Sequence, residues 1–228
     1  MYDHLLAAIV EHDLAPGTKL PEDTLAETFG VSRTRVRKVL QQLAHEGMVQ
    51  LERHRGATVA RPSVKDARDI FDVRRILEAG MVRLIAGNLG QRELARLRRA
   101  VTDEREAYAR QDRRRAISLS GSFHLELARL TDNATLHAMM RELVARTSLI
   151  IAVYAPARGP ICLCDEHEAL IDAVRRGDPD EAARVMDHHL DHIATTLALV
   201  GDGAEPIDLK TVLAQVAHRR RAGGADPE

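Results

Sequence analysis

Helical periodicity dominates the sequence and most limits the folds open to the chain. From residue 64 to about residue 200, apolar residues recur every three or four positions almost without a break, which is typical of amphipathic helices. Strand-like alternation is confined to two short segments near residue 50. The sequence therefore predicts a mainly α protein, in which a six-helix antiparallel bundle follows a smaller unit with one β-hairpin.

The first sixty residues predict three helices and a hairpin. We expect helices over residues 2–11, from Pro21 to residue 29, and from a Ser32 cap to residue 46, with Gly30 and Gly47 as stops. Residues 48–51 and 57–60 alternate like strands and are joined by a basic tip that contains a glycine. This order predicts a winged helix-turn-helix, whose second helix has the size to enter a DNA major groove.

Charge is distributed unevenly, although the net charge of −1 argues against a general nucleic-acid binder. Residues 1–30 carry one basic and six acidic residues, whereas residues 31–61 carry seven basic and two acidic ones. A phosphate backbone favours such a positive face. The alternative is that Arg33 and Arg37 only solvate an exposed helix. The arginines of residues 92–115 alternate with acids at helical spacing, and we interpret that stretch as a solvated helix face.

The N-terminal segment resembles the GntR family of DNA-binding regulators. The resemblance rests on PGTKLPE at residues 16–22, FGVSRT at 29–34, EGMV at 46–49 and RGATVA at 55–60. It implies DNA contacts on the recognition helix and at the wing tip, made by Arg33, Thr34, Arg35, Arg37, Lys38, Arg55 and Gly56. Two positions depart from the family pattern: Arg35 replaces the usual proline, and His12 stands near a usual glycine.

Residues 66–200 resemble the FCD effector domain of the FadR-like subfamily. The matching pairs include Val73-Arg74, Leu77-Glu78, Phe123-His124, Glu166-His167, Gly177-Asp178 and His189-Leu190. We therefore expect a DNA-binding domain over residues 1–62, an all-helical ligand-binding domain over 63–200, and a C-terminal extension over 201–228 to which no role is assigned.

The FCD resemblance implies a divalent metal site, because cavities of that family often hold an ion on one aspartate and three histidines. His124, His167 and His189 match the histidines, and three imidazoles suit zinc or nickel. Ser120 occupies the aspartate position, four residues before His124, and a hydroxyl is a poor ligand. Three histidines with water, a lapsed site, and histidines with only structural roles stay open. A thiolate contribution from Cys162 or Cys164 is a further alternative.

The same resemblance implies a small carboxylate effector. Arg74 occupies the position where members of the family have an arginine that can bind an acidic effector. An ion pair with Glu78 is an equal alternative. Ser120 and Asn133 are further effector candidates, and Asn133 also suits a helix N-cap.

Taken with the DNA-binding segment, these features predict a cytoplasmic homodimeric transcription regulator that binds operator DNA, uses no organic cofactor and catalyses no reaction. No apolar run is long enough to span a membrane. A metal-sensing regulator, a regulator with an unliganded bundle, and a three-histidine metal hydrolase with Glu166 or Glu168 as base are the alternatives.

Overall fold

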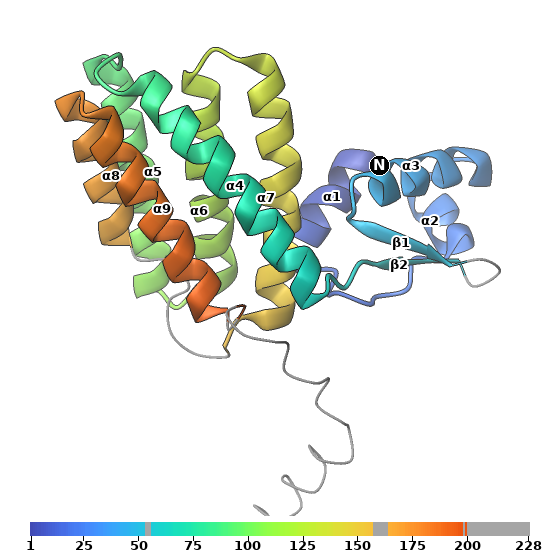
Figure 1. Ribbon diagram of the computed structural model, residues 1–228. Helices are drawn as coiled ribbons and strands as arrows, with labels where there is room; N and C mark the ends of the chain where they lie inside the picture. The colour runs from blue at the N-terminus through green and yellow to red at the C-terminus, as the bar shows by residue number, and fades with distance from the viewer. Residues whose placement is uncertain (53–55, 157–163, 198, 200–228) are drawn as a thin grey trace, which may run out of the picture.

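Three short helices and one hairpin form the N-terminal part of the computed structural model, which describes residues 1–52, 56–156, 164–197 and 199. The helices are α1 (Tyr2–Val10), α2 (Glu22–Phe29) and α3 (Arg33–His45), and the hairpin pairs β1 (Val49–Glu52) with β2 (Gly56–Val59) in antiparallel register. Gly30, with φ of 61°, ends α2, and the Ser32 side chain caps α3. The winged helix-turn-helix is therefore confirmed, and we call this part the reader (Figure 1).

Six helices among the described residues make up the second part, which we call the bundle (Figure 1). They are α4 (Val64–Ile85), α5 (Gln91–Ala109), α6 (Arg113–Leu130), α7 (Ala134–Tyr154), α8 (Cys164–Arg176) and α9 (Pro179–Thr196). Ser63 and Asp66 form a capping box at the start of α4. Asp178 caps α9 with Pro179 in the first turn, as the Gly-Asp-Pro sequence predicts.

The reader packs directly on α7 of the bundle. Its apolar core, which includes the fully buried Ile9, Val36 and Leu43, continues into Ala145 and Leu149 of α7. The two parts therefore share an apolar contact in addition to the linker after residue 60.

The buried stripe of α4 differs from the one that apolar periodicity predicts. Apolar spacing along the helix selects Ile70, Val73, Leu77, Met81 and Leu84; Ile70 and Met81 are buried, but Val73 and Leu84 are 42% and 60% exposed. The buried face also carries Phe71, Val82 and Ile85 together with two charged residues, Arg74 and Glu78. Because charged residues occupy inward positions, a search for apolar residues alone selects a stripe displaced around the helix.

No helix among the described residues is long and apolar enough to cross a membrane. Arg55 at the wing tip, Cys162 and the extension over residues 201–228 lie outside the described residues.

Candidate effector site and DNA-binding face

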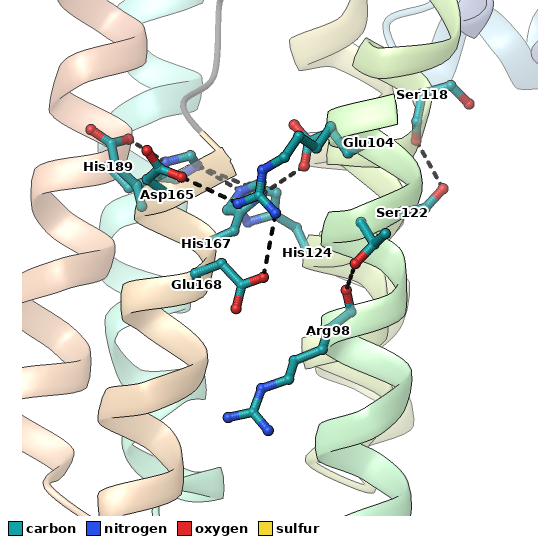
Figure 2. A network of polar contacts seen from close by, with 12 residues as sticks. Arg98, Glu104, Ser118, Ser122, His124, Asp165, His167, Glu168 and His189 are labelled. Atoms are coloured by element: carbon teal, nitrogen blue, oxygen red, sulfur yellow. Dashed lines mark hydrogen bonds and ion pairs between the residues drawn. The ribbon is translucent and has the colours of Figure 1, made fainter. Parts of the chain in front are cut away.

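Three histidines from three helices of the bundle meet in its interior. His124 comes from α6, His167 from α8 and His189 from α9, and each is at most 2% exposed. The Nε2 atom of His189 lies 3.3 Å from Nε2 of both other rings, and one ligand atom from each histidine lies within 4.8 Å of the others. Figure 2 shows the rings converging between the helices. The structure therefore gathers the three histidines that the family resemblance selects.

A carboxylate lies behind each of these rings. Glu78 of α4 accepts from Nδ1 of His124 at 2.5 Å, and Glu104 of α5 contacts Nδ1 of His167 at 2.9 Å. Glu166 contacts Nδ1 of His189 at 2.8 Å. A carboxylate at Nδ1 holds the proton there, so the Nε2 lone pairs face one another.

Sequence reasoning missed these carboxylates or misplaced them. We placed Glu104 on a solvated helix face, but it is fully buried. The signal that could have found it is its position on the buried stripe of α5, which carries Leu94, Leu97 and Val101 at the same spacing. Glu166, which we considered as a catalytic base, holds His189 with one oxygen and His192 with the other.

Their surroundings keep His124 and His189 neutral and Glu78 ionised. Burial lowers the pKa of His189 from 6.5 to about 3 and also lowers the pKa of His124. Burial alone would raise the pKa of Glu78, but the adjacent Arg74 and His124 outweigh it and lower the pKa to about 2. Neutral imidazole is the form that binds a metal ion.

The donor set fits a first-row divalent ion. Three inward Nε2 atoms, each backed by an acid, form the carboxylate–histidine pairs that accompany metal-bound imidazole in proteins. Among the described residues, the group able to hold an ion contains the three histidines and no cysteine. Burial raises the pKa of Cys164 to about 11, which disfavours its thiolate in the metal-free protein.

A cavity of about 110 Å³ lies against His124. Its wall contains Arg74, Ser120 and Thr147 of the bundle, several apolar side chains, and Val10 from the reader. Ser120 therefore lies beside the site, as the four-residue spacing from His124 suggests.

Arg74 forms the ion pair with Glu78 that the sequence offers as one of its two roles. Its Nε donates to Glu78 at 2.6 Å and its Nη1 to Thr147 at 3.3 Å, whereas its Nη2 is buried and has no hydrogen-bond partner among the described residues. A buried donor without a partner is costly, and a carboxylate ligand would satisfy it.

Asn133 takes the helix N-cap role that the sequence offers as its alternative. It is exposed, its side chain accepts from the backbone N–H of Leu136 at 3.0 Å, and it does not line the cavity. The cap of α7 uses its only side-chain acceptor.

The proposed DNA-contacting residues of α3 are all exposed: Arg33, Thr34, Arg35, Arg37 and Lys38. Gly56 begins β2 with φ of 88°, a conformation that favours glycine. Two acids of α2, which sequence reasoning did not pair, contact the arginines. Glu22 accepts from Nε of Arg37 at 2.8–2.9 Å, and Asp23 pairs with Arg33.

Residues 1–59 match the family described as bacterial regulatory proteins, gntR family, and residues 69–192 match the FCD domain. The chain belongs to the GntR family, with an FCD domain. The matches to both families also confirm the FadR-like assignment.

Curated relatives of this GntR-family chain are named as repressors. It is 30% identical to the HTH-type transcriptional repressor NanR of Cronobacter sakazakii, over 85% of this chain and 82% of that protein. It is 28% identical to a probable D-xylose utilization operon repressor of Paenarthrobacter nicotinovorans, over 82% and 83% of the two chains. The protein is therefore a DNA-binding transcription regulator rather than an enzyme, which excludes the hydrolase alternative.

A solved structure shares the fold. The structure of a putative GntR regulator from Rhodococcus sp. RHA1 superposes with a TM-score of 0.78, at 24% identity, over 88% of this chain and 97% of that one.

Proposed function

We propose that a small carboxylate effector, bound in the bundle cavity beside a divalent metal ion, controls operator binding by this regulator. The observation that carries the proposal is the inward triplet of His124, His167 and His189 with a carboxylate behind every ring. Such an ion supplies an electrophilic centre that attracts a carboxylate oxygen. The residues that would hold it are the three histidines.

The residues around the cavity would orient the acid. Arg74 is held by Glu78 and Thr147, and its remaining Nη2 would donate to the effector carboxylate. Ser120 adds a hydroxyl in place of a charged ligand, which leaves more of the coordination shell to the effector and to water. A cavity of about 110 Å³ is smaller than the roughly 150 Å³ cavity that holds benzene in another protein, so the expected ligand is a small organic acid.

The partly apolar cavity and the free Nη2 of Arg74 favour this proposal over two alternatives. A regulator that senses the metal alone gives no reason for the buried Nη2 of Arg74, which has no hydrogen-bond partner among the described residues. An unliganded bundle would leave this buried donor without a partner, at a cost in stability.

Metal analysis by mass spectrometry tests the proposal. Purified protein should hold about one equivalent of a transition metal, which His189→Ala should lose. His188→Ala is the matched control, because His188 is the neighbouring residue on α9 and is 78% exposed at its side chain. The result that contradicts metal binding is an empty wild-type protein after incubation with zinc, nickel and manganese.

We also propose a homodimer that places two recognition helices on a two-fold-symmetric operator. The described surface of α4 supports it, because Val73, Ile76, Gly80 and Leu84 follow one another at spacings of three and four residues on one helix face. Ile76 is 75% and Leu84 60% exposed. An exposed apolar stripe of this kind is typical of a contact between two copies of a protein.

A further inference from the structure

His12 has a backbone conformation that is uncommon for a residue with a side chain. It follows α1 with φ of 62°, in the left-handed region that glycine adopts without strain. Glycine would therefore end α1 at this position with less strain, and a histidine here calls for an explanation in the contacts of its ring.

The ring of His12 reaches across to the bundle. Its Nε2 lies 2.8 Å from Oγ and 3.0 Å from the backbone oxygen of Ser148 on α7. The hydroxyl of Ser148 donates in turn to the backbone oxygen of Val10 at 2.7 Å. A hydroxyl has one proton, which Ser148 uses on Val10, so His12 must be the donor from Nε2 to Ser148. The segment at the end of α1 therefore both donates a hydrogen bond to α7, through His12, and accepts one from it, at Val10.

Two of the three linked residues form part of the cavity wall. Val10 and Ser148 line the cavity, next to Thr147, which accepts from Arg74. On the other side, α1 is anchored in the reader by the fully buried Ile9, which belongs to the same apolar cluster as Val36 and Leu40 of the recognition helix. A continuous set of contacts therefore runs from the wall of the cavity to α3.

We propose that His12 couples the cavity to the DNA reader, so that filling the cavity moves α1, and with it α3, through the link between His12, Ser148 and Val10. This inference rests on the proposed function, because it takes the cavity as the effector site. His12 acts as a positioning residue that touches neither effector nor DNA. A nearby ion pair between Asp13 and Arg114 also joins the reader to the bundle. Both of its side chains are more than 60% exposed, so this pair contributes little to the stability of the contact.

A double-mutant experiment tests the coupling without knowledge of the effector. Ser120→Leu fills the cavity with an apolar side chain, and His12→Gly removes the link while relieving the strain of positive φ. Operator DNA selected in vitro by the wild-type protein serves as the ligand, and operator Kd is measured for each single variant and the combination. Asp13→Asn is the matched control, because it breaks the adjacent exposed contact between reader and bundle and keeps His12.

The expected result is that Ser120→Leu shifts the operator Kd about fivefold or more in the wild-type and Asp13→Asn backgrounds. The shift should fall below about twofold in His12→Gly, which should still bind the operator by itself. Equal shifts with and without His12, or no shift in either background, would overturn the coupling alone. A wild-type protein that selects no DNA would contradict the proposed function as well.

Hydrogen exchange gives a second readout that does not involve DNA. The amides of Glu11 and Leu14 donate to Ala7 and Ala8 at the end of α1. Ser120→Leu should change their exchange rates in the wild-type protein and leave them unchanged in His12→Gly. A purely structural His12 would change exchange by the same factor whether or not the cavity is filled.

Discussion

Replacing Glu78 by glutamine should strongly destabilise the bundle. Glu78 is fully buried and accepts hydrogen bonds from Arg74, which is 2% exposed, and from His124. Glutamine keeps the size of the side chain, so packing should hardly change, but the buried guanidinium loses its counter-charge. Removing one partner of a buried ion pair costs about 3–5 kcal/mol. We expect a loss of that size in the free energy of unfolding.

Urea unfolding followed by circular dichroism, near neutral pH and with a chelator present, measures this loss. Glu126→Gln is the matched control: its side chain is 24% exposed and pairs with the half-exposed Arg129, so it should cost at most about 1 kcal/mol. Adding Arg74→Met to Glu78→Gln removes the stranded cation and should recover much of the stability. A Glu78→Gln variant within about 1 kcal/mol of the wild type, or no recovery in the double variant, would refute the reasoning.

Three further predictions concern DNA, assembly and pH. Arg37→Ala should weaken operator binding by about 1–3 kcal/mol, whereas Arg98→Ala on the bundle should leave it unchanged, as measured by fluorescence anisotropy. Ile76→Asp should convert a dimer to a monomer in light scattering, and an unchanged mass would exclude this face of α4 as the interface. The chelated protein should lose stability as pH falls from about 6.5 toward 3. The pKa of His189 is lowered from 6.5 to about 3, first by burial, so in that window the unfolded chain takes up a proton that the folded protein rejects. Equal urea midpoints at both ends of this window would contradict that assignment.

Features that depend on neighbours along the chain could be predicted from the sequence. Glycine at the end of α2, the Ser63 cap of α4 and the Gly-Asp-Pro boundary before α9 are local signals, and each lies where the structure begins or ends a helix. Helical periodicity predicted the mainly α class for the same reason. The three histidines came from the family resemblance, because their spacing alone does not distinguish a site from core or surface residues.

The pairing of groups at the site could not be predicted from the sequence, because it depends on how the helices pack. Glu78 and His124 are 46 residues apart in the chain, and Glu104 and His167 are 63 apart, so no local pattern pairs them. Apolar periodicity selects the wrong face of α4 because Arg74 and Glu78 can pair along the helix, but only the packing of α6 and α7 buries the pair and adds His124 and Thr147 as partners. The contact between His12 and Ser148 could not be predicted from local sequence either, because the two residues are 136 positions apart. Local sequence encodes helices and caps, whereas compensation of buried charge and contact between reader and bundle depend on helix packing.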